Sequence, residues 1–228
     1  MRSYVVPDPQ LEALSARTLD VPYRDLRGFE YACKGVFDRL AAAIRLAVLG
    51  VPMVAVAVLI KLSSSGPVLV GQTRVGRFGR PFTFYKFRSM RQNAERLRDD
   101  LEDQNDHDAP LIFKMRRDPR VTTVGKFLRR TSLDELPNLF NVLSGEMSII
   151  GPRPPLAREV VHYERRHLQR LAAKPGITGL WQVRGRSEIP FEEMVDMDLE
   201  YIERWSLWLD LCILVRTPVA VLGGRGAW

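Results

Sequence analysis

Two adjacent carboxylates, Asp134 and Glu135, are the residues whose type and spacing point most directly to chemistry. One carboxylate can attack phosphorus as a nucleophile while its neighbour holds a metal ion, so such a pair suits phosphoryl transfer. The pair also has a structural interpretation. Ser132 and Glu135 have the spacing of a capping box, and acidic residues are favoured in the first turn of a helix. The two carboxylates alone leave both interpretations open.

Basic residues surround this pair along the chain. Arg129 and Arg130 precede it, and Arg153 follows it between two prolines, which would hold the arginine on a stiff loop. Lys86 and Arg88 lie upstream among aromatic residues. If the fold gathers these cations, they can neutralise diphosphate oxygens and offset the repulsion of an acidic nucleophile. Otherwise the arginine between the prolines lies in a plain turn and meets a surface carboxylate.

One apolar run, residues 40–62, is a candidate for membrane insertion. Its charge-free part, residues 46–60, would be about 22 Å long as a helix, against a hydrocarbon core of about 30 Å. Pro52 lies near the middle, where it removes a helical hydrogen bond and bends the axis. Basic residues flank the run on both sides, whereas a spanning helix usually has them on one. The pattern predicts a re-entrant helix; the alternative is a core helix of a soluble protein.

The remaining patterns predict the elements that would position the charged residues. Alternating β-branched and aromatic residues over 68–90 indicate a short hairpin or a few extended strands. An acidic solvated helix and loop is expected over 91–109, a helix over 159–171, and an amphipathic helix over 190–204. Residues 205–222 suit a segment in the membrane interface or, alternatively, a packed core helix.

Composition limits the class of protein. The chain has 228 residues, 46% of them apolar, and a net charge of +7, which excludes wholesale disorder. A single apolar run excludes a multi-pass membrane protein. Two cysteines build no disulfide framework, and three scattered histidines are too few for a histidine-based metal site. The basic surplus indicates an anionic partner, either nucleic acid, a lipid surface or a phosphorylated substrate. We find no nucleic-acid-binding signature and no signal peptide, and we expect no nucleic-acid partner.

Several motifs occur in a fixed order along the chain. They are the apolar helix with its central proline, GPVLVGQTRVGRFGRPFTFYKFRSM, DPRVTTVGKFLRRTSLDELPNLFNVLSGEMSIIGPRP and KPGITGLWQVRGR. With these motifs the chain resembles, from about residue 34 to residue 228, the bacterial sugar transferase family of monotopic polyprenyl-phosphate phosphoglycosyl transferases. Long members of that family carry further membrane helices and another domain before this catalytic unit.

The resemblance implies a reaction. Sugar-1-phosphate would move from a UDP-sugar to undecaprenyl phosphate, giving an undecaprenyl-diphosphate sugar and UMP in the first membrane step of exopolysaccharide or glycoconjugate synthesis. Asp134 would be the nucleophile that forms a covalent phosphosugar intermediate, and Glu135 would help to hold Mg²⁺. Glucose or galactose is the expected sugar. Other substrate-binding positions carried over are Lys86, Arg88, Arg129, Arg153, Gln182, Arg186 and Asp198, the last of which could instead lie on a solvated helix face.

The fold expected from the residues and the resemblance together is α+β and mostly helical. It has an N-terminal extension (1–33), a re-entrant membrane helix (34–64) and a cytosolic or interfacial catalytic domain (65–228) with amphipathic helices around a small α/β unit. The expected location is the cytosolic face of the bacterial inner membrane, with a homodimer as a further expectation. Val51 stands where the family often has serine, which would make the bend at Pro52 shallower. A non-catalytic membrane-surface scaffold of polysaccharide assembly is the alternative function.

Overall fold

The computed structural model describes residues 26, 28–92 and 118–223, together with residues 94, 97, 101 and 115. Most of the predicted N-terminal extension and of the acidic segment 91–109 therefore lies outside the described residues. The first half of the described chain contains α2 (Phe29–Ser63), β1 (Leu69–Val75), η1 (Arg77–Gly79), β2 (Pro81–Phe87), α3 (Thr123–Arg130), η3 (Leu133–Asn138) and α4 (Leu139–Ser144). The second half contains β3 (Ser148–Ile150), α5 (Ala157–Val160), α6 (Arg165–Leu168), η4 (Gln169–Ala172), β4 (Gly176–Thr178), α7 (Leu180–Arg184), η5 (Arg186–Glu188), α8 (Phe191–Glu203) and α9 (Leu207–Gly223). The expected mostly helical α+β class is confirmed.

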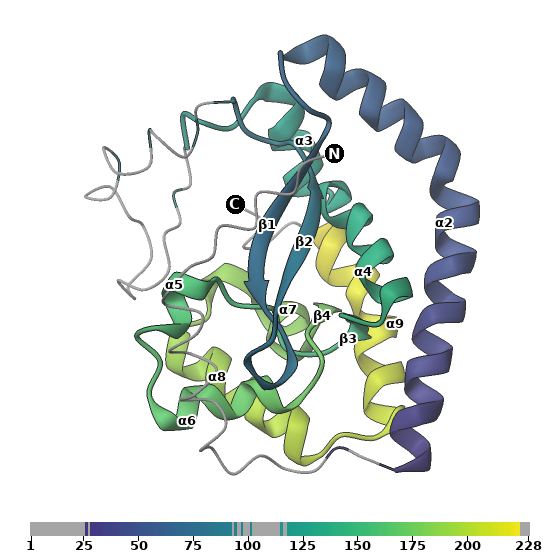
Figure 1. The fold of residues 1–228 in the computed structure, drawn as a ribbon, viewed down its shortest axis with the longest axis vertical. Coiled ribbons are helices and arrows are strands. Elements are labelled where there is room, and N and C mark those ends of the chain that lie inside the picture. Colours follow the sequence, from purple (N-terminus) through teal and green to yellow (C-terminus); the bar gives the residue numbers. More distant parts are fainter. Residues whose placement is uncertain are drawn as a thin grey trace.

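Helix α2 runs along one side of the molecule and bends over it toward the hairpin (Figure 1). Among the described residues it is the one helix long and apolar enough to cross a membrane, and only 11% of its most apolar window is buried. A core helix of a soluble protein would be mostly buried, so that alternative is wrong for α2. Pro52 lies inside the helix without ending it. The apolar side chains that α2 leaves uncovered include Ile44, Val48, Val51 and Val54, which suits a surface in contact with lipid.

A stripe of buried residues joins α2 to the rest of the protein. Lys34, Asp38, Ala42, Val56 and Ile60 are buried and recur at helical spacing on one face. The helix therefore touches the body with one side along its length while its other side is exposed.

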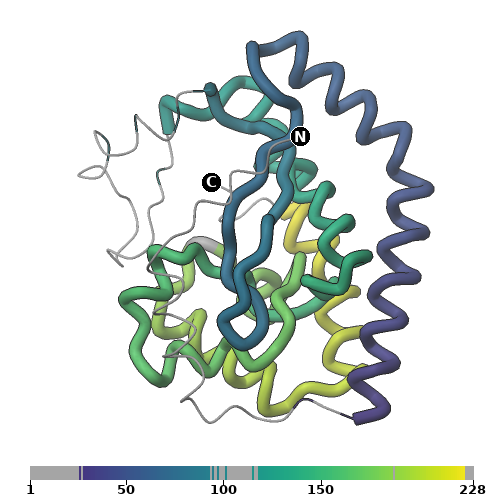
Figure 2. The backbone as a smooth tube through the Cα atoms, viewed as in Figure 1, coloured from purple at the N-terminus to yellow at the C-terminus, as the bar shows by residue number. Residues whose placement is uncertain are grey.

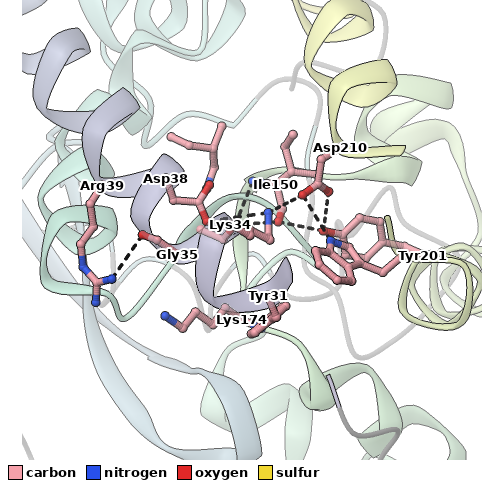
Figure 3. A network of polar contacts seen from close by, with 12 residues as sticks. Tyr31, Lys34, Gly35, Asp38, Arg39, Ile150, Lys174, Tyr201 and Asp210 are labelled. Carbon is pink, nitrogen blue, oxygen red and sulfur yellow. Dashed lines mark hydrogen bonds and ion pairs between the residues drawn. The ribbon is translucent and has the colours of Figure 1, made fainter. Parts of the chain in front are cut away.

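The N-terminal part of this stripe is polar and lies in a buried network with α9 (Figure 3). The Lys34 ammonium donates to Asp210 at 2.7 Å and lies 3.7 Å from Asp38. Asp38 in turn accepts a hydrogen bond of 2.7 Å from the Ser148 hydroxyl on β3. The Tyr201 hydroxyl donates to Asp210 at 2.8 Å. Because these charges are buried and paired with one another, they hold α2, β3, α8 and α9 in one arrangement.

The hairpin β1–β2 crosses the middle of the body, as the backbone trace also shows (Figure 2). Its antiparallel register pairs Leu69 with Phe87 and Val75 with Pro81, which confirms the predicted hairpin. Phe82 and Phe84 alternate onto the face that joins the main hydrophobic core, with Val142 and Met147 from the region of α4. A second, parallel pair of short strands, β3 and β4, lies beside this core.

Two further predictions have mixed outcomes. Residues 159–171 do not form one helix, because α5 ends at Val160 and α6 begins only at Arg165. Tyr163 in the break is buried against Phe191, with ring centroids 5.6 Å apart, so its packing overrides local helix propensity. The amphipathic helix 190–204 is confirmed as α8.

The C-terminal segment forms helix α9, whose Asp210 pairs with Lys34 of α2 (Figure 3). It is not a packed core helix, since Asp210 and Ile213 are its only described buried residues. Trp208, Val215 and Val219 are among its exposed side chains. Together with the exposed face of α2, these residues give the molecule a broad apolar surface.

The buried network predicts the stability of a variant. Lys34→Met would leave the Asp210 and Asp38 charges without their shared cation, so we expect a loss of about 3–5 kcal/mol in the free energy of unfolding. Denaturant unfolding in detergent measures this loss. Arg39→Met is the matched control, because Arg39 is an exposed cation on the same helix. Equal stability of the two variants would contradict the role given to the network.

Candidate active site

A cavity of about 490 Å³ opens among α2, η3, α7 and α9. It gathers seven of the predicted site residues from segments that are far apart in the sequence. They are Lys86, Arg129, Asp134, Glu135, Arg153, Gln182 and Arg186. Its other walls include apolar side chains of α2 and α9, namely Leu49, Leu214, Ala220 and Val221. The cavity therefore has charged walls and apolar walls within one enclosure.

The two carboxylates lie on η3, directly after a sharp turn. Ser132 adopts left-handed backbone angles (φ 56°, ψ 19°), which reverses the chain between α3 and η3. The Ser132 side chain forms no cap hydrogen bond, so the alternative capping box with Glu135 is not formed. Glu135 points instead to cations from other segments. The capping-box part of the local interpretation is therefore wrong, whereas its other part is confirmed, because both carboxylates lie in the first turn of η3.

Glu135 is held by two cations from distant parts of the chain. Arg153 Nη2 donates to Glu135 Oε1 at 2.9 Å, and Lys86 Nζ lies 3.8 Å from the same oxygen. Burial alone would raise the pKa of Glu135, but the charges of Arg153 and Lys86 outweigh it and lower the pKa to about 2. Glu135 is consequently a carboxylate throughout the physiological pH range.

Asp134 lies in the opposite electrostatic situation. It is 6% exposed, and burial followed by the neighbouring charge of Glu135 raises its pKa to about 6, although Lys86 and Arg129 oppose the rise. Two adjacent carboxylates whose environments separate their pKa values commonly have different tasks. At neutral pH Asp134 is ionised, poorly solvated and close to several cations, as an anionic nucleophile requires.

Strand geometry brings Lys86 to the carboxylates. Lys86 follows Phe82 and Phe84 at alternating positions of β2, so its side chain leaves the same face of the hairpin, and its ammonium lies 5.1 Å from the Phe84 ring centroid. Burial lowers the pKa of Lys86 to about 8, despite the attraction of Glu135. The charge of Lys86 is therefore sensitive to mild alkali.

Arg153 is carried by a loop whose backbone is clamped on both sides. The Gly151 amide donates to Thr178 at 2.9 Å, and the Gly176 amide donates to Pro152 at 2.8 Å. Arg74 Nη1 donates to the Pro154 carbonyl at 2.8 Å. A Cβ on Gly151 would lie 2.3 Å from the Lys174 carbonyl oxygen, so this close approach requires glycine. These contacts support the stiff loop predicted from the two flanking prolines.

The other cavity residues come from α3 and from the region of α7. Arg129 lies in the last turn of α3, and its Nε donates to the Ser89 hydroxyl at 3.1 Å. Gln182 on α7 donates through Nε2 to the Ile177 carbonyl at 3.2 Å, while its Oε1 is buried without a described partner. Arg186 has positive φ (55°), and burial lowers the pKa of its guanidinium. These three side chains extend the charged and polar wall beyond the carboxylates.

Two predicted substrate-binding residues lie outside the cavity. The Arg88 guanidinium donates to the carbonyls of Pro67 and Ser64, beside the C-terminal end of α2. Because β2 ends at Phe87, the alternation that directs Lys86 into the cavity does not extend to Arg88. Asp198 is 1% exposed and forms an ion pair with Arg170, so it lies neither in the cavity nor on a solvated helix face.

Sequence reasoning missed several residues that build or line the cavity, among them Asn141, Arg74 and Arg45. Asn141 is fully buried and ties α4 to β2, with Nδ2 donating to the Thr83 carbonyl at 2.7 Å. Arg74 is buried under the Arg153 loop. Arg45 lines the cavity from α2. A polar residue in an otherwise apolar helical stretch was the available signal for Asn141 and Arg45, whereas the position of Arg74 in a strand carried none.

The cavity offers two carboxylates, Asp134 and Glu135, as candidate ligands for Mg²⁺. Within the described part of the chain, no three acidic, histidine or cysteine side chains gather as a metal site. Mg²⁺ in phosphoryl-transfer sites is commonly bound by one or two carboxylates together with substrate phosphates. Arg153 and Lys86 both contact Glu135 through its Oε1 atom. Asp134 lies in the same cavity. The two carboxylates fit a metal that arrives with a phosphorylated substrate.

Comparison with known proteins gives several relatives of high similarity. The chain is 46% identical over 195 residues to "Galactosyl transferase CpsE" of Streptococcus agalactiae serotype III (strain NEM316), covering 85% of this chain and 43% of the relative. It is 44% identical over 212 residues to "UDP-glucose:undecaprenyl-phosphate glucose-1-phosphate transferase" of Xanthomonas campestris pv. campestris, covering 90% and 42%. It thus spans less than half the length of these two relatives.

A shorter relative is matched over most of its length. "Exopolysaccharide production protein ExoY" of Rhizobium meliloti (strain 1021) is 37% identical over 198 residues, which cover 86% of this chain and 88% of the relative. The family described as bacterial sugar transferase matches residues 29–224, from the start of α2 to just beyond α9. With this match and the assembled cavity, the chain belongs to the bacterial sugar transferase family.

Proposed function

We propose that this chain transfers a hexose-1-phosphate from a UDP-sugar to undecaprenyl phosphate, giving an undecaprenyl-diphosphate sugar and UMP. The observation that carries the proposal is the cavity in which Asp134 and Glu135 face Lys86, Arg129 and Arg153. The names of relatives support the substrates, since one is a UDP-glucose:undecaprenyl-phosphate glucose-1-phosphate transferase and another an undecaprenyl-phosphate galactose phosphotransferase. Glucose and galactose are therefore the first sugars to test.

In the first step, an Asp134 carboxylate oxygen attacks the sugar-bearing phosphorus of the UDP-sugar. A bond forms between Asp134 and phosphorus, the bond from that phosphorus to the bridging oxygen breaks, and UMP leaves with the bridging oxygen. Lys86, Arg129 and Arg153 neutralise phosphate oxygens, so the anionic nucleophile and the diphosphate can approach one another. The low solvation of Asp134 keeps its carboxylate reactive.

In the second step, a phosphate oxygen of undecaprenyl phosphate attacks the same phosphorus. The new phosphorus–oxygen bond completes the diphosphate of the product, and the bond to Asp134 breaks, which restores the carboxylate. The two substrates are thus processed in turn, as ping-pong kinetics would report.

We also propose that the reaction requires Mg²⁺. Glu135, with Asp134 beside it, would hold the ion through its carboxylate, and the bound ion would neutralise diphosphate charge and stabilise the leaving phosphate. Arg153 positions Glu135 for this task by holding Oε1.

The membrane arrangement follows from the substrates. One substrate is water-soluble and the other is embedded in lipid, so the cavity must lie at the membrane surface. The exposed apolar faces of α2 and α9 support such a position. We propose that α2 enters the bilayer as a re-entrant helix, bends at Pro52, and leaves the catalytic domain on the cytosolic side of the inner membrane.

The nucleophile assignment predicts the behaviour of Asp134→Asn. An amide of nearly the same shape cannot form the acyl phosphate, so UMP release in the presence of undecaprenyl phosphate should fall by at least about 10³-fold. Asp196→Asn, an exposed carboxylate on α8, is the matched control and should retain wild-type turnover. Full activity of Asp134→Asn with UDP-glucose or UDP-galactose would refute the assignment. A non-catalytic scaffold predicts no UMP release even from the wild type.

The two perturbed pKa values predict a bell-shaped pH profile. Asp134 attacks only as a carboxylate, so kcat/KM for the UDP-sugar should rise about tenfold per pH unit below its pKa of about 6. Activity should fall again above about pH 8, where Lys86 loses its proton. Initial rates between pH 5 and 9.5 measure both limbs. Lys86→Arg should remove the alkaline limb, and a flat profile from pH 5 to 7 would contradict the Asp134 assignment.

The metal assignment predicts a linked change in Mg²⁺ dependence. Removing divalent ions with EDTA should abolish turnover, and added Mg²⁺ should restore it. Glu135→Gln should need at least about tenfold more Mg²⁺ for half-maximal rate, because a neutral amide is a weaker ligand than a carboxylate. Mg²⁺ titration of UMP release compares the variant with the wild type. Unchanged turnover in EDTA would show that the two carboxylates act without the ion.

A further inference from the structure

Arg45 is a cation on the apolar helix α2, and it has no role in the two reaction steps proposed above. It is half-buried and lines the same cavity as Asp134 and Glu135. Within the described part of the chain it forms no hydrogen bond or ion pair. A guanidinium in a membrane-inserted helix is costly unless an anion or water accompanies it, so an arginine at this position indicates a functional contact.

The position of Arg45 on α2 directs it toward the body of the protein. It continues the buried stripe formed by Lys34, Asp38 and Ala42, and Leu49 one turn later also lines the cavity. Neighbouring Ile44 and Val48 lie on the exposed face instead. Arg45 therefore faces the cavity side, where a bound anion could reach it.

The cavity that Arg45 lines also has apolar side chains from two helices. Leu49 comes from α2, and Leu214, Ala220 and Val221 come from α9. The cations that would hold the UDP-sugar diphosphate, Lys86, Arg129 and Arg153, come from other segments. One cavity thus contains three cations from other segments and a further cation, Arg45, one turn before the apolar Leu49 on α2.

From this combination we infer that Arg45 binds the phosphate of the lipid acceptor, and that the apolar wall between α2 and α9 receives the first isoprene units of its chain. The inference rests on the proposed function and assigns the acceptor subsite within it. A monophosphate needs few cations, and an isoprenoid chain needs a hydrocarbon lining, so the acceptor matches this part of the cavity in both charge and polarity. Arg45 would then direct the phosphate oxygen toward the phosphosugar on Asp134.

The variant Arg45→Gln tests whether this residue contributes to binding of the acceptor and not of the UDP-sugar. Steady-state rates with the full chain in detergent, at varied undecaprenyl phosphate and saturating UDP-sugar, give the acceptor KM. Loss of one charge-assisted contact should raise this KM at least about tenfold. The donor KM, and the burst of UMP released without acceptor, should stay at wild-type values. Arg45→Lys should restore most of the acceptor affinity, and Arg39→Gln, an exposed cation on the same helix, should match the wild type.

A second pair of variants tests the apolar wall. Ala220→Trp would fill the space between α2 and α9 and should also raise the acceptor KM. Val219→Trp places the same side chain at a residue of α9 that is 73% exposed, so it should leave the acceptor KM unchanged.

Two results would overturn the inference while leaving the proposed function intact. One is an unchanged acceptor KM in Arg45→Gln, as expected if the guanidinium only reaches lipid headgroups. The other is an equal rise of donor and acceptor KM, which would assign Arg45 to the diphosphate. A wild-type protein that releases no UMP from any UDP-sugar would overturn the proposed function and the inference together.

Discussion

The ion pair between Arg153 and Glu135 is the contact on which the rest of the cavity depends. It joins the loop after β3 to η3, and Lys86 approaches the same carboxylate oxygen from β2. Because these cations stabilise the Glu135 charge, its pKa falls to about 2, and that fixed negative charge in turn contributes to the raised pKa of Asp134. One ion pair therefore contributes both to the geometry of the adjacent carboxylates and to the difference between their pKa values.

The supporting elements explain why this ion pair can form. The Arg153 loop is held by hydrogen bonds from Gly151, Gly176 and Arg74, so the arginine loses little further freedom when it meets Glu135. Asn141 joins α4 to β2, which sets the distance between η3 and Lys86. The buried polar groups that do this are all partnered, as a rigid site requires.

The buried network around Lys34 and Asp210 has a different consequence. It fixes α2 beside α9, and the space between these helices forms the apolar part of the cavity. The same helices expose their other faces as a broad apolar surface. Under the proposed function, this arrangement would serve two needs, namely a surface that contacts the bilayer and a path for the lipid-borne substrate from the bilayer to the carboxylates.

Local features of the sequence were sufficient to predict part of the fold and part of the candidate site. The adjacency of Asp134 and Glu135, the prolines that flank Arg153, the apolar run of α2 and the alternation in β2 depend on neighbouring residues, so they can be recognised in the chain itself. The tertiary structure alone decided which cations reach the carboxylates. Arg88 lies two residues after Lys86 yet binds carbonyls near the end of α2, and Asp198 is buried against Arg170, whereas Arg45 reaches the cavity from the apolar helix. The direction of a side chain depends on where its element ends and on what packs against it, and these contacts join residues that are distant in sequence.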